Sequence, residues 1–508
     1  MFNLKLKKID NIFNKIKYLI EFIISIMFSY VVFRIIFIKN NYGYISAKYL
    51  FYIVPIVSLL IFNILYCIYK SEKKIEKIFI SFIIPIGMLY WIFMIPSQVA
   101  DEMAHLWRAY EVSEGIFISS NKNETKVPKD LVYNIKPYVV NYNQMVTVTK
   151  DNPEFDELEI VNNTAKAYPA TLYLFSGFGF FIGRILNLSF IISSYIAKLF
   201  NYIIFIIAGY YIIKIMPIGK FAIFTLLFSP MVLHQATSTS ADAMVNISCL
   251  LFIAYIMKLL LKKEKICIKE LILYLIIALF ISIAKYVYLP LIGISLLLIS
   301  SKNLNIKGKI VIIGTIIISC ITAIGCYKYS LTYPGSYDEY LNRVGANSTL
   351  QIKYMKENPL KILEMTRNTL ERNGLTYLHE ALGLKLGWAN IFVNDLWISL
   401  FIIILFASCY LEKNEIVLKK IQKLWILLIC FVIIFLIIIG LYIAWTPVGY
   451  EISTGIQGRY FIPIIPLILL CLLLKENYIK IEKVEYKLPI LLSIINIPVI
   501  ITIIKFFS

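Results

Sequence analysis

Charged residues, paired cysteines and histidines are all scarce in this 508-residue sequence. Only 16% of the residues are charged, whereas a soluble domain carries about a quarter, so the composition argues against an ordinary soluble protein. The eight cysteines include no C-x-x-C pair and none lies in a long polar loop, so neither a zinc site nor a disulfide framework is predicted. The histidines are three, His105, His234 and His379, and internal repeats are absent.

Hydrophobic residues make up 59% of the chain and are grouped in blocks of about twenty. Such a block matches a hydrocarbon core about 30 Å thick, and a segment that crosses lipid must satisfy its backbone amides as a helix. We therefore expect an all-α polytopic membrane protein. The thirteen predicted spans lie near 18–38, 48–70, 77–96, 190–214, 219–236, 240–262, 269–284, 286–301, 308–331, 391–412, 423–445, 459–475 and 487–507.

The net charge of +19 is explained by lysines in short loops between the apolar blocks. Lysine-rich loops mark the cytoplasmic side of membrane proteins, so nucleic acid is not an expected partner. The first block follows five lysines and lacks a signal-peptide cleavage site, which predicts a retained anchor and a cytoplasmic N-terminus. The loops that become cytoplasmic together are 73–77, 214–220, 258–269, 302–309, 413–423 and 475–487.

The apolar block 168–187 conflicts with this pattern if it also crosses the membrane, because every later lysine loop would then lie outside. We therefore expect it to lie along the outer interface or to be re-entrant. Its small residues, Ser176, Gly177, Gly179 and Gly183, suit close packing against other helices. The alternative is a true span, with another block miscounted.

This threading divides the chain into five segments. They are N-terminal spans (1–96), an outer loop with an acidic motif and interfacial helices (97–189), further spans (190–331), a second outer loop (332–390) and C-terminal spans (391–508). In the second loop we expect a helix from Pro359 to Arg372, with Asn358 as its N-cap.

A dense group of polar residues follows the third predicted span. If residues 102–113 form a helix, Asp101, His105 and Arg108 lie on one side of it. Ionisable groups at a membrane boundary are costly unless paired or functional, so Asp101, Glu102 and His105 are the candidate catalytic residues. The alternative is an ordinary helix start, with the acids favoured by the helix dipole and Arg108 paired with Asp101.

Further polar residues occur at predicted outer turns much later in the sequence. With Arg108, the candidate substrate-binding residues are His234, Asp242, Lys285, Gln457, Arg459 and Tyr460. An arginine at a membrane boundary can bind a phosphate through two hydrogen bonds. The structural alternatives are a helix-terminal acid for Asp242, a snorkelling side chain for Lys285 and an aromatic-belt position for Tyr460.

These residues share one predicted membrane face, and their chemistry suits transfer from a lipid-linked phosphate donor. A carboxylate can accept a proton from an incoming hydroxyl. Lysine or arginine can stabilise the departing phosphate as its charge develops.

The motif Asp-Glu-x-Ala-His-x-x-Arg-Ala-Tyr at 101–110 resembles the signature of the domain-of-unknown-function 2142 family of bacterial membrane proteins. Matching features follow in order: Tyr168-Pro169 with Tyr173, Ser229-Pro230 through Asp242, Gly383 with Gly387-Trp388, and Gln457 to Tyr460. That family is similar to the GT-C glycosyltransferases, polytopic enzymes that use polyprenyl-phosphate sugars. The resemblance implies a GT-C-like fold, inverting transfer and a catalytic base at Asp101 or Glu102. The departures are Ala100 before the acids and an additional span ahead of the acidic loop.

The leading hypothesis is a glycosyltransferase in the bacterial cytoplasmic membrane, with a lipid-linked donor of the undecaprenyl phosphate type and a cell-envelope glycan or protein as acceptor. A transporter or flippase is an alternative, but it would need charged residues within the spans or inverted repeats. A polymerase or ligase of lipid-linked glycans, and a non-catalytic scaffold, remain alternatives. The sequence identifies no definite cofactor and leaves open a divalent cation, Mg²⁺ or Mn²⁺, with Glu102 as a ligand.

Overall fold

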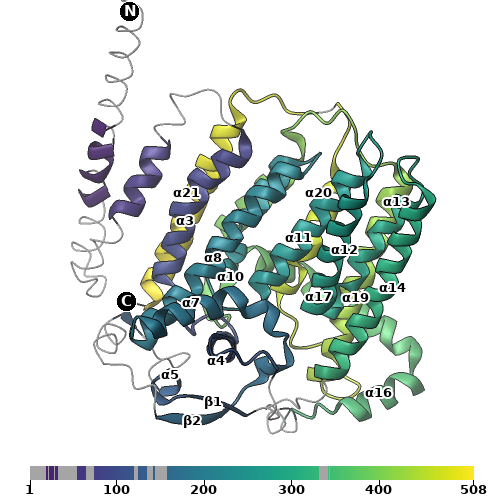
Figure 1. Ribbon diagram of the computed structural model, residues 1–508, viewed down its shortest axis with the longest axis horizontal. Helices are drawn as coiled ribbons and strands as arrows, with labels where there is room; N and C mark the ends of the chain where they lie inside the picture. The colour runs from purple at the N-terminus through teal and green to yellow at the C-terminus, as the bar shows by residue number, and fades with distance from the viewer. Residues whose placement is uncertain are drawn as a thin grey trace, which may run out of the picture.

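The computed structural model describes residues 19–31 (except 21 and 28), 54–64, 74–118, 124–133, 141–142, 157–330, 341, 344–476 and 478–507. Within these residues the protein is mostly helical, and its two short sheets have two strands each. The fold-class prediction of a helical polytopic protein is confirmed at this level. Figure 1 shows the long helices running in roughly the same direction.

Six described helices are long and apolar enough to cross a membrane, judged by length and composition. They are α3 (Ile75–Phe93), α8 (Phe190–Ile215), α11 (Ala241–Leu260), α14 (Ile306–Ser330), α19 (Lys420–Trp445) and α21 (Val484–Phe507). At 1.5 Å per residue the shortest extends about 28 Å, close to the thickness of a hydrocarbon core. These six correspond to six of the thirteen predicted spans. The spans predicted at 18–38 and 48–70 lie only partly within the described residues.

The other five predicted spans are short or interrupted helices. They are α9 (Lys220–Leu227) with α10 (Pro230–Ala236), α12 (Ile268–Ala284), η4 (Tyr286–Ser295) with α13 (Leu296–Ile299), α18 (Asp395–Ala407) with η5 (Ser408–Tyr410), and η6 (Gly458–Ile464) with α20 (Ile465–Leu472). Prolines accompany three of the interruptions: Pro230 begins α10, and Pro290 and Pro463 lie inside the 3₁₀ helices η4 and η6. Proline lacks the backbone N–H that would continue an α-helix.

The first long loop forms a small layer of its own. Its elements are α4 (Glu102–Ser113), β1 (Glu124–Pro128), α5 (Lys129–Tyr133), β2 (Leu158–Asn162), η2 (Thr164–Ala167), η3 (Ala170–Tyr173) and α7 (Leu174–Ile185). The strands β1 and β2 are antiparallel, with Glu124 opposite Asn162 and Pro128 opposite Leu158. Figure 1 shows α4, α5 and this hairpin together at one end of the long helices.

Helix α7 occupies most of the ambiguous block 168–187. Its 12 residues extend about 18 Å, too short to cross the hydrocarbon core alone, which supports the interfacial interpretation. Its glycines allow close packing: a Cβ on Gly177 would lie 2.8 Å from the Val112 side chain, and one on Gly179 would lie 2.8 Å from the Ala197 backbone. The predicted role of the small residues is therefore confirmed for contacts with α4 and α8.

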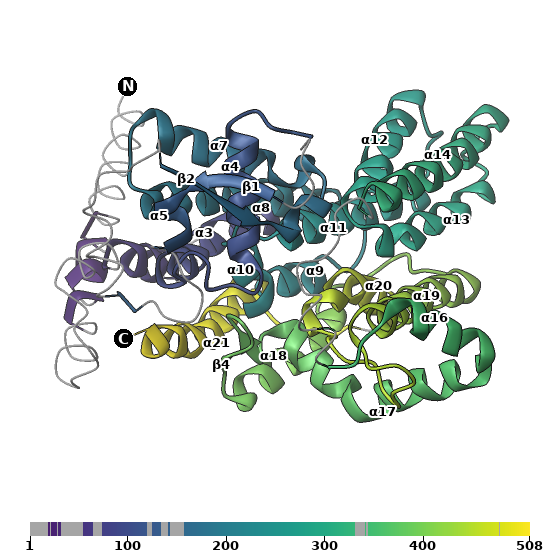
Figure 2. The same ribbon diagram turned by 90° about the horizontal axis from the view of Figure 1, so that it is seen from below.

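The second long loop contains α16 (Ser348–Glu357), α17 (Pro359–Leu382), β3 (Lys385–Leu386) and β4 (Ile391–Phe392). Helix α17 begins where the sequence predicts, with Pro359 in its first turn and Asn358 at the N-cap position. The predicted end at Arg372 is wrong, because the helix continues to Leu382 and stops at Gly383, whose φ is 121°. Viewed from below, α16 and α17 lie on the other side of the molecule from α7 (Figure 2).

Candidate functional site

Asp101 lies in a turn that the second long loop holds in place. Both Ser97 and Asp101 have left-handed backbone conformations, with φ of 66° and 63°, which residues other than glycine rarely adopt. The Ala100 N–H donates to the Gly387 carbonyl at 3.2 Å, and the Trp388 indole N–H donates to the Ser97 carbonyl at 3.0 Å. The Gly387-Trp388 pair therefore fixes the turn that presents Asp101.

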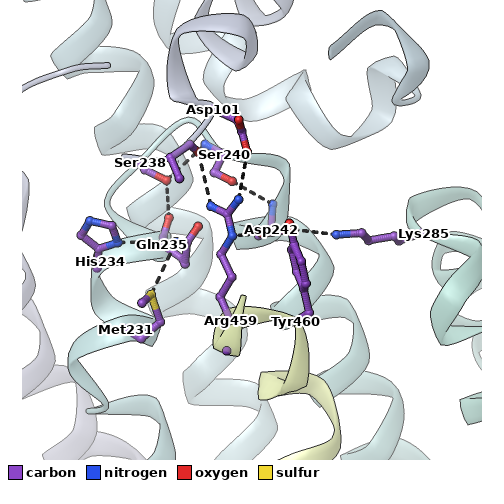
Figure 3. Close-up of polar contacts among 12 residues, drawn as sticks. Asp101, Met231, His234, Gln235, Ser238, Ser240, Asp242, Lys285, Arg459 and Tyr460 are labelled. Atoms are coloured by element: carbon purple, nitrogen blue, oxygen red, sulfur yellow. Dashed lines mark hydrogen bonds and ion pairs between the residues drawn. The ribbon is translucent and has the colours of Figure 1, made fainter. Parts of the chain in front are cut away.

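Four charged side chains from four parts of the chain form what we call the ion-pair row: Asp101, Arg459, Asp242 and Lys285. Arg459 Nη2 lies 3.0 Å from Asp101 Oδ2, and its Nε lies 3.3 Å from Asp242 Oδ2. Asp242 Oδ1 lies 3.2 Å from Lys285 Nζ. Figure 3 shows Arg459 reaching between the two carboxylates. The row places acids and cations in alternation, which limits the cost of burying them.

Local structure explains the position of each partner. Ser240 is the N-cap of α11 and its hydroxyl accepts from the Asp242 N–H at 3.2 Å, which places Asp242 in the first turn. Lys285 stands at the break between α12 and η4, and its Nζ lies 4.7 Å from the centre of the Tyr460 ring. Arg459 and Tyr460 follow Gly458, the first residue of η6. Helix ends and interruptions thus supply the charged groups.

Glu102 is a fully buried support for this turn. Its carboxylate accepts hydrogen bonds from the Val99 N–H at 3.2 Å and the Thr239 N–H at 3.0 Å. Burial raises the pKa of Glu102, and the nearby Lys198 ammonium opposes that rise. These bonds tie the start of α4 to the turn before α11, so Glu102 connects the two acidic parts of the ion-pair row.

His105 lies one helical turn beyond Asp101 and contacts two tyrosines. Its Nδ1 is 2.7 Å from the Tyr173 hydroxyl, and its ring stacks on Tyr173 with centroids 5.7 Å apart. Tyr168 packs against it from another side. Burial lowers the pKa of His105 to about 4, outweighing the opposing effect of the Asp101 and Asp242 carboxylates. The imidazole is therefore neutral near pH 7 and can orient a hydroxyl without adding charge.

Arg108 is directed away from the ion-pair row. Its guanidinium lies 2.8 Å from Glu111 and donates to the carbonyls of Ile116 and Phe117 at 3.2 and 2.8 Å. Lys166 pairs with the same Glu111 at 3.3 Å. The alternative in which Arg108 pairs with Asp101 is therefore wrong, and the guanidinium holds the turn after α4.

His234 and Gln457, the two remaining candidate binding residues, form hydrogen bonds within the protein. His234 Nε2 accepts from the Gly387 N–H at 3.1 Å, and its Nδ1 lies 3.4 Å from the Gln235 amide. His234 therefore supports the loop that holds Asp101. Gln457 is the N-cap residue of η6, where its carbonyl accepts from the Tyr460 N–H at 3.1 Å.

A cavity of about 480 Å³, called here the main cavity, opens beside the ion-pair row. Its polar end is lined by Asp101, His105, Tyr168, Lys285 and Tyr460. Its apolar wall comes from two helices long enough to cross a membrane and from the end of α12: Ile283, Cys326, Leu436, Ile437, Gly440, Leu441, Ala444 and Trp445. The cavity can therefore hold a molecule with a charged end and a hydrocarbon end.

Four residues that the sequence predicts to share a site do line the main cavity: Asp101, His105, Lys285 and Tyr460. The wall residues of α19 were not predicted, because in the sequence they look like ordinary lipid-facing positions. Tyr168 had a signal, the Tyr168-Pro169 pair, but no role was assigned to it. Among the described residues no group of three or more His, Cys, Asp and Glu side chains is placed to hold a metal ion, so the divalent cation stays a prediction.

A glycine sets the position of Arg459. A Cβ at Gly458 would overlap the Glu380 side chain and the Tyr377 carbonyl of α17. We expect Gly458→Ala to destabilise the protein by about 1–3 kcal/mol, as overpacking does in well-packed cores. Thermal unfolding in detergent measures this. Gly374→Ala on α17 is the control, because a Cβ there meets nothing within 4 Å, and equal stability of both variants would contradict the expectation.

Comparison with known proteins gives one match. No curated protein and no solved structure matches the chain. A family model described as "Predicted membrane protein (DUF2142)" matches residues 85–468. This range contains the ion-pair row and every residue that lines the main cavity. The chain therefore belongs to the domain-of-unknown-function 2142 family of membrane proteins.

Proposed function

We propose that the protein is a glycosyltransferase that moves a sugar from a polyprenyl phosphate to a cell-envelope glycan or protein at the outer face of the bacterial cytoplasmic membrane. The observation that carries the proposal is the main cavity, which is lined both by charged residues and by an apolar wall that comes mostly from α19. A polyprenyl-phosphate sugar has the same division, with a charged head and a long hydrocarbon tail. Ligand sites in proteins typically combine an apolar lining with a few placed polar groups.

In the proposed reaction the Asp101 carboxylate accepts the proton of an acceptor hydroxyl. The acceptor oxygen forms a bond to the anomeric carbon while the bond from that carbon to the phosphate oxygen breaks. The polyprenyl phosphate leaves with the electron pair, and the Lys285 ammonium stabilises its negative charge. Attack from the side opposite the leaving group inverts the anomeric carbon. Neutral His105, held by Tyr173, orients the acceptor hydroxyl.

The difference in exposure makes Asp101 a better base than Glu102. The Asp101 side chain is 39% exposed and lines the main cavity. Glu102 is fully buried and its oxygens accept hydrogen bonds from Val99 and Thr239. A general base must reach the proton that it removes, and only Asp101 has this access.

The test is to incubate the purified protein with undecaprenyl phosphates that carry single hexoses, N-acetylhexosamines or pentoses, together with envelope acceptors. Formation of undecaprenyl phosphate with labelled sugar on an acceptor is the expected result for at least one donor. Movement of intact donor across vesicle membranes without cleavage would instead indicate a flippase. The proposal would be overturned if the protein neither cleaved any donor nor bound undecaprenyl phosphate.

A further inference from the structure

Arg459 has a different position from the one that phosphate binding would require. Its side chain is only 6% exposed, and it is not among the residues that line the main cavity. Lys285 and Asp101 both line it. A phosphate in the cavity therefore meets the Lys285 ammonium, while the Arg459 guanidinium is already paired with Asp101 and Asp242.

The contacts of Arg459 converge on the turn that carries Asp101. Nη2 lies 3.0 Å from Asp101 Oδ2, and Nη1 donates to the Ala100 carbonyl at 3.3 Å. One guanidinium thus holds both the side chain of Asp101 and the backbone before it. Asp101 has a φ of 63°, a conformation that persists in a residue other than glycine only when its surroundings enforce it. Among the described residues Asp101 Oδ1 has no hydrogen-bond partner, which leaves this oxygen for a ligand.

Asp242 fixes the other side of the arrangement. Its Oδ2 lies 3.3 Å from Arg459 Nε, and its Oδ1 lies 3.2 Å from Lys285 Nζ. Asp242 is therefore the common partner of the two cations. It also competes with any phosphate for the Lys285 ammonium, since both are anions.

We propose that Arg459 is a positioning residue that aims Asp101 Oδ1 into the main cavity, with Asp242 holding the guanidinium, and that Lys285 is the cation that binds the donor phosphate. The inference rests on the proposed glycosyltransferase function. It separates two cations that the sequence alone treats as equivalent phosphate ligands. The planar guanidinium is needed because its Nη2, Nη1 and Nε contact Asp101, Ala100 and Asp242 separately, and the single nitrogen of a lysine cannot take all three positions.

The experiment measures two quantities on the purified full-length protein: the dissociation constant of undecaprenyl phosphate and the rate of donor cleavage. Arg459→Lys should bind undecaprenyl phosphate as the wild type does, but cleave donor about 100-fold more slowly, the loss expected from a misplaced catalytic group. Lys285→Gln should weaken binding about tenfold or more, the loss expected when a charged contact to phosphate disappears. Asp242→Asn should bind more tightly than the wild type, because the competing anion is gone.

Arg184→Lys is the matched control and should change neither quantity. Arg184 pairs with Glu114 at a distance of 3.0 Å, and neither residue lines the main cavity. If Arg459→Lys weakens binding as much as Lys285→Gln does, Arg459 is a phosphate contact and the inference is overturned while the proposed function stands. Full cleavage by Arg459→Lys also overturns it. If an Arg459 variant does not fold, Asp242→Asn decides: unchanged or weaker binding contradicts the arrangement. A wild type that neither binds undecaprenyl phosphate nor cleaves donor overturns the proposed function itself.

Discussion

Replacing Asp101 by asparagine is expected to lower sugar transfer by about 100- to 10,000-fold, the range for loss of a general base. Asparagine keeps the size of the side chain, and its amide oxygen can still accept from Arg459. It cannot accept the proton of the acceptor hydroxyl near neutral pH. Binding of undecaprenyl phosphate should persist, because the proposed phosphate contact is Lys285.

The measurement compares donor cleavage and undecaprenyl phosphate binding in wild type, Asp101→Asn and Glu114→Gln. Glu114 is a partly exposed carboxylate at the far end of α4, paired with Arg184, so its conversion to an amide tests for general effects of removing an acid. We expect Glu114→Gln to cleave donor normally. Full activity of a folded Asp101→Asn protein would remove Asp101 as the base, and with it the proposed mechanism.

The charged residues of the ion-pair row could be predicted because each one is unusual for its place in the sequence. Lys285 interrupts apolar sequence, Arg459 stands at the start of a predicted span, and Asp101 follows one. Burying such groups is costly without partners, so the sequence indicates that they meet. The partners themselves depend on how the loops pack, and nothing near Ser97 and Ala100 in the sequence indicates that the second loop contacts them.

The partner of Arg108 illustrates this limit. Asp101 and Arg108 are seven residues apart, about two helical turns or 10 Å along the axis. Glu111 is only three residues away, a spacing that favours a direct pair, and it forms the ion pair at 2.8 Å. Asp101 is also outside the helix, in a left-handed conformation, so it does not share the face of Arg108.

The apolar wall could not be predicted, because a lipid-facing residue and a cavity-facing residue have the same composition. Leu436, Ile437 and Leu441 on α19 fit either role. In a soluble protein hydrophobic periodicity separates the buried face of a helix from the solvated face. In a membrane span both faces are apolar, so only the packing of α19 against its neighbours reveals the cavity.

A larger side chain on this wall is expected to weaken binding of undecaprenyl phosphate, and this is the second large effect that we predict. Gly440 lines the main cavity on α19, and a Cβ there would meet nothing within 4 Å. Gly440→Leu should therefore fold normally and place its side chain in the space assigned to the hydrocarbon tail. A single methylene in an apolar pocket changes binding by about 10- to 200-fold, so we expect at least a tenfold weaker binding of undecaprenyl phosphate.

Gly314→Leu on α14 is a close control. It is also a helical glycine with nothing within 4 Å of its Cβ position, and it does not line the main cavity. Both substitutions raise helix propensity equally, so a difference in binding reports on the cavity alone. If both variants bind as the wild type does, the tail lies elsewhere and the cavity wall loses its assigned role. A second result would locate the two parts of the ligand: Gly440→Leu loses binding of undecaprenyl phosphate, while inorganic phosphate still protects Lys285 from chemical modification. The charged head and the hydrocarbon tail then occupy separate parts of one site, as the division of the cavity requires.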